Sequence, residues 1–242
     1  GFKLNINKIK SKLSSKTKFL IINSPNNPTG KVLNRNEFNE IIQILRSNEN
    51  LNILSDEIYE FILKKEFNHE SLASLADDLK DRIFTINGFA KGWAMTGWRV
   101  GYLVGREDVI KASSALQSQS TSNVCSFAQR GAIAALQING KFFDQLNAKY
   151  DERRNVLIKG IQKINGLYIY PPEGAFYAFP KLPNKSISSV EFCNRAIDDF
   201  GLVVVPGKVF GNDQCIRISC AASIDKIIDG LSRLEKAITK YY

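Results

Sequence analysis

Short apolar runs alternate with amphipathic segments through the first half of the chain. The runs are rich in Ile, Leu, Val and Phe, which is typical of buried strands, and they lie at residues 18–23, 51–55, 82–86 and 100–104. Asn34 and Glu37 have the spacing of a capping box and open an amphipathic segment that predicts a helix. Residues 71–79 predict a second, shorter helix. Strands separated by helices favour βαβ units and an α/β fold with a mostly parallel sheet and flanking helices.

Helical periodicity dominates from residue 107 onward. The predicted helices cover residues 107–118, 126–136 and 141–164. Beyond Pro171-Pro172 the pattern mixes short strands with helices, over residues 174–179, 190–199, 202–205, 215–219 and 224–240. This change predicts two domains: a larger α/β domain at 1–140 and a smaller α+β domain at 141–242.

Composition narrows the classes of function. The 242 residues carry a formal net charge of +9, but Lys and Arg are spread along the chain rather than gathered in a stripe with aromatic residues, which argues against nucleic-acid binding. No apolar run is long enough to cross a bilayer, and no secretory leader is recognisable, so we expect a cytoplasmic protein that does not bind membranes.

The cysteines and the single histidine argue against two kinds of chemistry. The four cysteines form no C-x-x-C pair and lie far in sequence from His69, so we expect free thiols and no metal site. Residues 67–70 form a polar stretch that predicts a surface loop around His69, which weakens any mechanism with a histidine base.

Polar clusters follow the predicted strands. In open α/β sheets, ligands bind beyond the carboxyl ends of the strands. Such clusters lie at residues 24–30, 56–59 and 87–91, and Arg217 stands on a predicted strand of the second domain. Each cluster alone is also compatible with a purely structural role, namely a turn, a helix cap, a solvated lysine or an ion pair.

Taken together, these clusters resemble the signatures of class I/II aminotransferases, pyridoxal-phosphate enzymes of fold type I. Ser-Pro-Asn-Asn-Pro-Thr-Gly and Asn-Gly-Phe-Ala-Lys, the latter typical of the aspartate aminotransferase branch, are the most specific matches. The matches come in family order, at residues 24–30, 55–59, 87–102, 172–177 and 216–219. The resemblance implies an incomplete large domain followed by a small domain.

The same resemblance implies how pyridoxal 5′-phosphate is held. Lys91 corresponds to the lysine that binds the cofactor as a Schiff base, and Asp56 to the carboxylate that keeps the ring nitrogen protonated. Asn27 and Tyr59 correspond to the donors to the phenolic oxygen, and Arg99 to the guanidinium that binds the phosphate.

A second arginine is expected to bind the substrate. Arg217 resembles the residue that binds the α-carboxylate of the substrate, and Asn27 is expected to contribute to the same site. Its apolar neighbours Ile216 and Ile218 place it on a strand, where a lone arginine needs a partner.

Two departures from the family pattern stand out. Many members have hydroxyl residues three positions and one position before the cofactor lysine, where this chain has Gly88 and Ala90. The family also has a long segment before the Asn-Pro-Thr-Gly loop, with a phosphate-binding loop and a stacking aromatic ring, whereas residues 1–23 precede it here. We therefore expect the C-terminal portion of a longer enzyme, or a truncated product.

The resulting functional hypothesis is transamination between an L-amino acid and a 2-oxo acid. Aspartate and 2-oxoglutarate are the first substrates to consider, with Lys91 as the group that moves the α-proton and a homodimer as the expected assembly. Three alternatives stay open: transamination of aromatic or other amino acids, a truncated or degenerate chain without activity of its own, and a cofactor-binding module of a regulator.

Overall fold

The computed structural model describes residues 2–183 and 187–242, and the chain divides into two compact units. The N-terminal unit comprises Lys3–Pro25 and Val32–Phe143. The C-terminal unit comprises Phe2, Asn26–Lys31 and Asp144–Tyr242, so the loop at 26–31 groups with the second half of the chain.

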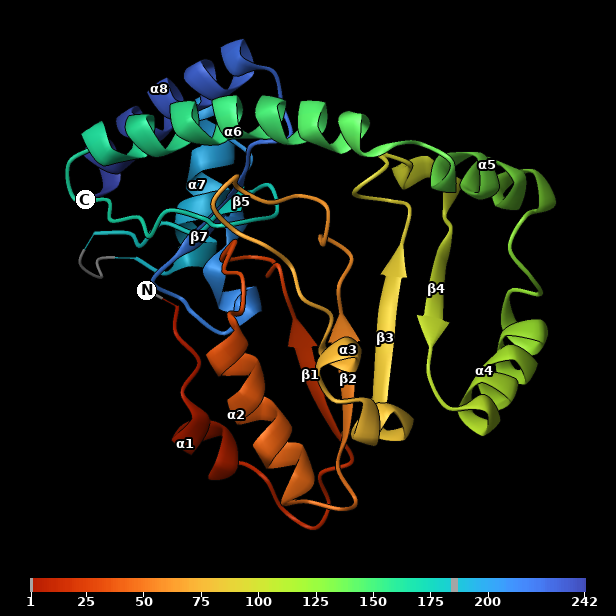
Figure 1. Cartoon of the computed structure of the whole chain (residues 1–242). Coiled ribbons are helices and arrows are strands. Elements are labelled where there is room, and N and C mark those ends of the chain that lie inside the picture. The colour runs from red at the N-terminus through yellow and green to blue at the C-terminus, as the bar shows by residue number, and fades with distance from the viewer. Residues whose placement is uncertain (1, 184–186) are drawn as a thin grey trace. The chain divides into compact units, whose positions relative to one another are not determined.

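The N-terminal unit is built on a four-stranded sheet in the order β1-β2-β3-β4. β1, β2 and β3 run parallel, and β4 is antiparallel to β3 (Figure 1). The elements are α1 (Ile6–Lys10), β1 (Phe19–Asn23), α2 (Arg35–Arg46), β2 (Asn52–Asp56), α3 (Leu72–Leu75), η1 (Asp77–Arg82), β3 (Ile83–Gly88), η2 (Thr96–Trp98), β4 (Gly101–Val104), α4 (Glu107–Ser120) and α5 (Ser126–Leu136). A mostly parallel sheet with flanking helices confirms the predicted fold class.

One face of this sheet is covered and the other is partly bare. Alternate residues of a strand point to opposite faces, so Ile22 of β1 packs with Phe38 and Ile41 of α2 while Ile21 points the other way. Ile21 is 68% exposed and Phe19 is 48% exposed. The hydrophobic core of the unit therefore lies on the side of α1, α2 and α3.

The segment at 71–79 differs from its prediction. Instead of one helix it forms α3, a break at Ala76 (φ −143°, ψ 67°), and η1, which extends to Arg82. Arg82 donates to the carbonyl oxygens of Leu45 and Asn48 at the end of α2, each at 2.9 Å. Arg82 ends η1 and β3 begins at Ile83. Local periodicity could not indicate this long-range contact of Arg82.

The C-terminal unit contains a second, antiparallel sheet in the order β5-β7-β6. Phe192 and Ala196 of α7 pack with Ile216 of β7 and with Leu234 and Ile238 of α8. The elements are α6 (Gly140–Lys163), β5 (Tyr177–Ala178), α7 (Ser189–Phe200), β6 (Val205–Pro206), η3 (Gly207–Phe210), β7 (Ile216–Ser219) and α8 (Ile224–Tyr241). Among the residues described, no helix is long and apolar enough to cross a membrane.

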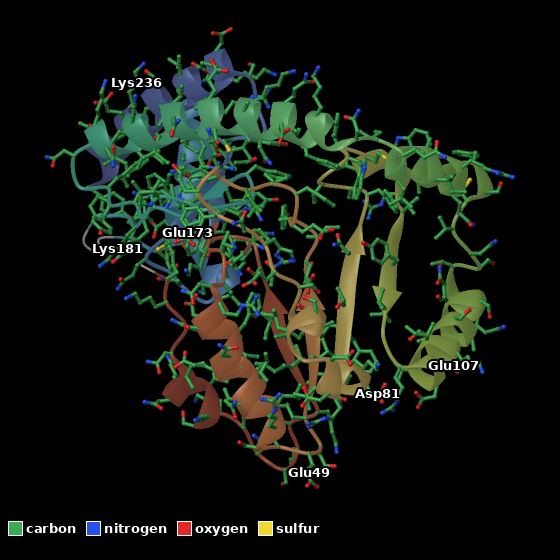
Figure 2. All side chains as sticks on the ribbon, in the orientation of Figure 1. Glu49, Asp81, Glu107, Glu173, Lys181 and Lys236 are labelled. Atoms are coloured by element: carbon green, nitrogen blue, oxygen red, sulfur yellow. The ribbon has the colours of Figure 1, made fainter. Side chains whose placement is uncertain are left out.

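The two edges of the large sheet differ in chemistry. Glu49, Asp81 and Glu107 point outward near the start of β2, the start of β3 and the end of β4 (Figure 2). The polar clusters of the sequence lie at the opposite edge, where β1, β2 and β3 end.

Candidate functional site

Three of the predicted cofactor residues lie at the carboxyl ends of β2 and β3. Asp56 is the last residue of β2 and pairs with Ile86 of β3. Tyr59 lies in the turn after β2, and Lys91 follows β3 by three residues. The Lys91 Nζ lies 5.9 Å from the centre of the Tyr59 ring, so this edge of the sheet brings an amine and a phenol together.

The Asp56 carboxylate has the properties that a protonated ring nitrogen requires. One oxygen, Oδ1, accepts a hydrogen bond from the backbone N–H of Ile58 at 3.2 Å, which fixes the turn. Burial raises the pKa of Asp56, and the neighbouring Glu57 raises it further against that hydrogen bond. Within the described ranges Asp56 forms no ion pair, so a cationic N–H beside it would relieve a partly buried charge. In this respect the residues fit pyridoxal phosphate.

Tyr59 is held by the backbone of its turn. The N–H of Glu60 donates to the Glu57 carbonyl at 2.9 Å, and that of Ile62 donates to the Tyr59 carbonyl at 2.8 Å. The side chain of Tyr59 is 4% exposed, so its ring has few alternative positions.

Arg99 is organised differently. It adopts a left-handed conformation (φ 54°), is exposed, and donates from Nη1 to the Thr96 carbonyl at 3.0 Å. No carboxylate pairs with it in the part of the chain that the structure describes. It borders an open cavity of about 760 Å³, which is also lined by Trp98, Asn123 and Cys125. The geometry therefore offers an accessible guanidinium, which is suited to an anion such as a phosphate.

The structure explains why position 88, three residues before Lys91, is a glycine and not a hydroxyl residue. Gly88 ends β3 opposite Gly101 of β4. A Cβ at position 88 would lie 2.7 Å from the Gly101 Cα and 2.8 Å from the Val100 carbonyl oxygen. A hydroxyl residue therefore cannot replace Gly88 unless β4 moves.

The C-terminal unit contains the loop with Asn27. A cis peptide bond joins Asn27 to Pro28, and the Gly30 N–H donates to the Asn26 carbonyl at 2.8 Å. Gly30 has a φ of +70°, and a Cβ there would lie 2.3 Å from the Pro172 Cβ. Glycine is therefore needed at this position for both conformation and space.

The loop is tied to the 172–175 segment of the same unit. The backbone N–H groups of Glu173 and Gly174 both donate to the Gly30 carbonyl, each at 2.8 Å. The Glu173 carboxylate (labelled in Figure 2) also pairs with Lys31 at 3.2 Å. Two segments far apart in sequence thereby hold the position of Asn27.

Arg217 lies on β7, as its apolar neighbours predict. Its Nη1 donates to the Asn27 Oδ1 at 2.9 Å. The guanidinium carbon lies 4.5 Å from the ring centre of Tyr177 and 5.0 Å from that of Phe210. Two rings and an amide therefore fix the planar fork of Arg217, which suits bidentate recognition of a carboxylate.

The structure thus brings Lys91 close to Tyr59, and Asn27 close to Arg217. Tyr177 and Phe210 were not predicted from the sequence as contacts of Arg217. Tyr177 lies in a motif that matched the family, but no local signal relates Phe210 to Arg217, because only the fold places them together.

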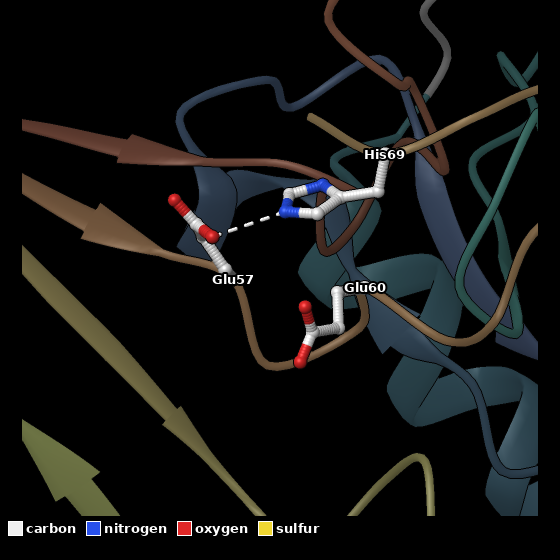
Figure 3. A group of neighbouring side chains, drawn as sticks. All are labelled: Glu57, Glu60 and His69. Atoms are coloured by element: carbon white, nitrogen blue, oxygen red, sulfur yellow. Dashed lines mark hydrogen bonds and ion pairs between the residues drawn. The ribbon is translucent and has the colours of Figure 1, made fainter. Parts of the chain in front are cut away.

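Residues 67–70 form a loop, as predicted, but the His69 side chain does not lie on its surface. Its side chain is 9% exposed and its Nε2 lies 3.0 Å from the Glu57 Oε2, with Glu60 nearby (Figure 3). Burial alone would raise the pKa of Glu57, but hydrogen bonds from His69, Ser55 and Ser71 bring it below its ordinary value. The polar residues around His69 gave no indication of its contact with Glu57, which lies twelve residues earlier in the chain.

Comparison with known proteins identifies the family. The model for "Aminotransferase class I and II" matches residues 1–233. A "Probable aspartate/prephenate aminotransferase" of Rickettsia typhi is 40% identical over 247 residues, covering 98% of this chain and 62% of that protein. A "Bifunctional aspartate aminotransferase and glutamate/aspartate-prephenate aminotransferase" of Petunia hybrida is 39% identical, covering 98% of this chain and 52% of that protein. The chain therefore spans less than two thirds of the length of these relatives.

Solved structures of similar fold belong to the same class of enzyme. The aspartate aminotransferase of Rhizobium meliloti matches with a TM-score of 0.94 and 31% identity, over 100% of this chain and 63% of that one. An aromatic aminotransferase of Pyrococcus horikoshii matches with a TM-score of 0.92 and 33% identity, over 99% of this chain and 64% of that one. Enzymes of this family depend on pyridoxal 5′-phosphate. From the fold, the ordered motifs and these matches, the chain belongs to the class I and II aminotransferases.

Proposed function

We propose that the chain carries the Schiff-base lysine and the substrate arginine of a pyridoxal-phosphate-dependent aminotransferase. The reaction is the transfer of an amino group from an L-amino acid, with aspartate as the first choice, to a 2-oxo acid such as 2-oxoglutarate. The observation that carries the proposal is the position of the Lys91 amine, 5.9 Å from the ring centre of the buried Tyr59 at the ends of β2 and β3. We further propose residues 1–140 as the cofactor domain, 141–242 as the small domain, and a homodimer as the assembly.

Five residues are proposed to hold the cofactor. Asp56 would accept a hydrogen bond from the protonated ring nitrogen, whose positive charge suits a partly buried carboxylate. Asn27 and Tyr59 donate to the phenolic oxygen, and the exposed fork of Arg99 binds the phosphate. Lys91 forms the covalent link through its amine.

Lys91 is also proposed to move the proton. When bound, pyridoxal phosphate stabilises negative charge on the α-carbon of the amino acid. The Lys91 amine would take the α-proton of the bound amino acid as a general base and return a proton as a general acid. Tyr59 limits the space in which the amine can move, since its buried ring lies beside Nζ.

Arg217 is proposed to bind the α-carboxylate of both substrates. The guanidinium is held by Asn27, Tyr177 and Phe210. A fork fixed in this way loses little side-chain entropy when a carboxylate binds. The amino acid and the 2-oxo acid then occupy one site in turn, which is ping-pong chemistry.

The choice of aspartate rests on relatives rather than on a side-chain pocket of this chain. The names of the Rickettsia typhi and Petunia hybrida proteins include aspartate and prephenate, and that of the Rhizobium meliloti structure includes aspartate. The Pyrococcus horikoshii structure is named for aromatic substrates, so aromatic amino acids form the second class to test.

A second candidate is a chain that has no activity by itself. Its support is the length of the match, which covers 62% of the Rickettsia typhi protein. In that case the residues proposed above are present, but the cofactor site needs further polypeptide to form.

The test is the visible spectrum of the chain with pyridoxal phosphate, before and after addition of aspartate. We expect a band that Lys91→Ala abolishes and that aspartate converts to the spectrum of pyridoxamine phosphate. A band that persists in Lys91→Ala contradicts the role of Lys91. A lysine-dependent band that aspartate leaves unchanged, but phenylalanine converts, contradicts the choice of aspartate.

The same experiment separates the second candidate. If the chain shows no band, a version completed with the remaining part of the Rickettsia typhi relative is measured. A band in the completed version supports a chain that is incompetent alone, and none in either contradicts the cofactor proposal.

A further inference from the structure

The turn after β2 has two chemically different sides. Asp56 and Tyr59 are the proposed cofactor residues, whereas Glu57 and Glu60 each follow one of them directly and have the same spacing of three. Because successive residues at a strand end point to opposite faces, Glu57 is directed away from the side that bears Asp56.

Glu57 ties the following segment to the strand end. Its side chain is buried, 4% exposed, and its Oε1 accepts from the Ser55 hydroxyl at 2.8 Å and the Ser71 hydroxyl at 3.1 Å. The backbone N–H of Leu72 donates to the same oxygen at 3.3 Å. One buried carboxylate therefore joins β2 to the start of α3.

His69 completes this network at the other oxygen. Its Nε2 lies 3.0 Å from the Glu57 Oε2 (Figure 3). A carboxylate only accepts, so Nε2 carries the proton of this hydrogen bond, and the buried Nδ1 has no partner in the described residues.

Glu60 points into the same cluster and reaches the other strand. The Asn87 Nδ2 donates to the Glu60 Oε1 at 2.6 Å. Asn87 is 4% exposed, lies on β3, and precedes Lys91 by four residues. Burial raises the pKa of Glu60, while the hydrogen bond from Asn87 opposes this shift. The Glu60–Asn87 pair therefore links the turn of Tyr59 to the strand that leads to Lys91.

We propose that Glu57, Glu60 and His69 are positioning residues that, through Asn87, fix the Asp56–Tyr59 turn relative to the Lys91 segment. This inference rests on the proposed function, because it assigns a purpose to the placement of Asp56, Tyr59 and Lys91. The cluster touches no substrate; it acts by holding two strand ends in register.

The alternative for this cluster is a metal site. The ligand atoms of Glu57, Glu60 and His69 lie within 4.8 Å of one another. However, Glu57 already accepts four hydrogen bonds, from Ser55, Ser71, Leu72 and His69. A metal would displace the His69 proton and compete with this network, so the satisfied carboxylate favours positioning.

The first test needs no cofactor and follows amide hydrogen exchange in the chain. We expect Glu60→Ala and Asn87→Ala to speed exchange about tenfold at residues 57–62 and 87–91, because the bond between the two segments is lost. Glu60→Gln should restore slow exchange, since its amide oxygen still accepts from Asn87. Unchanged exchange in folded Glu60→Ala would overturn the proposal.

Glu37→Ala is the matched control. Glu37 is also a buried carboxylate of the N-terminal unit, 9% exposed, and accepts from the backbone N–H of Asn34 at 3.0 Å. It completes the capping box at the start of α2 and also accepts from the backbone N–H of Leu4 at 3.4 Å. Its loss should speed exchange around α2 and leave residues 87–91 unchanged.

The second test separates positioning from general stability. In protein that takes up pyridoxal phosphate, Glu60→Ala should weaken cofactor binding about tenfold and move the pH midpoint of the Lys91-dependent band, with Glu60→Gln close to the original chain. Glu37→Ala should leave both unchanged. Equal effects of Glu37→Ala and Glu60→Ala would overturn the proposal, whereas failure of the original chain to form the band contradicts the proposed function and leaves the exchange test to decide the inference.

His69 gives a direct view of the cluster because it is the only histidine in the sequence. Its ring nitrogen signals should report the Nε2–H form and should not respond to one equivalent of Zn²⁺. A stoichiometric response of these signals to Zn²⁺ would replace the positioning role with a metal site.

Discussion

The two units hold their candidate residues in different ways. In the C-terminal unit, Arg217 is fixed by direct side-chain contacts with Asn27, Tyr177 and Phe210. In the N-terminal unit, the turn with Asp56 is fixed by backbone hydrogen bonds and by the Glu57 network behind it. Under the proposed function, the group that recognises the substrate is therefore held by its own side-chain contacts, whereas the groups around the cofactor are held by the strand ends that carry them.

The two arginines sharpen this contrast. Arg217 is stacked and hydrogen-bonded before any ligand arrives, and Arg99 is exposed with a hydrogen bond only to its own turn among the described residues. Under the proposed function, carboxylate recognition is thus preorganised in one unit, while phosphate recognition in the other unit rests on an exposed guanidinium with fewer contacts. Variants in each unit should therefore change different observables.

The largest effect is expected for Arg217→Leu. We expect the rate of conversion by aspartate to fall about 100-fold or more at subsaturating substrate, because a charge-assisted, bidentate contact is lost. The Lys91-dependent band itself should remain. Arg217→Lys, which keeps the charge but loses the fork, is the control and should recover only part of the rate. If Arg217→Leu lost the Lys91-dependent band as well as the rate, Arg217 would be needed for cofactor binding and not for substrate recognition alone.

A smaller effect is expected for Arg99→Leu. We expect cofactor affinity to fall about tenfold, since an exposed guanidinium contributes less than a buried one. Absorbance titration with pyridoxal phosphate measures it, and added salt should weaken the original chain more than the variant. An unchanged affinity would assign phosphate binding to other groups.

The smallest effect concerns Asp56 and pH in the cofactor-free chain. In the folded state, burial raises the pKa of Asp56 above its ordinary value of 3.8, so folding disfavours the charged form of this carboxyl group. The stability that this proton binding contributes is complete below pH 3.8 and is lost as pH rises through the folded pKa. Asp56→Asn should therefore unfold at slightly higher urea concentration at pH 7, by less than about 0.5 kcal/mol.

The difference in stability between the original chain and Asp56→Asn should disappear in acid. Below pH 3.8 both chains are neutral at this position, so their unfolding midpoints should converge. A gain in Asp56→Asn that persists at low pH would mean that charge burial is not its cause.

The sequence determined much of the N-terminal unit because its signals are local. Apolar runs marked β1, β2 and β3, and the capping box from Asn34 to Glu37 marked the start of α2. The polar clusters fell at the predicted strand ends, since parallel strands direct their carboxyl ends to one edge. Arg217 was placed on its strand by alternation alone.

Only the tertiary structure decided the contacts made across long stretches of sequence. Arg217 meets Asn27 across 190 residues, and Arg82 reaches the end of α2 across 37. His69 reads as part of a surface loop because its neighbours are polar, yet the fold buries it against Glu57. Local periodicity records which side of an element is apolar, but a hydrogen bond between distant polar groups leaves no periodic trace, so packing alone selects those partners.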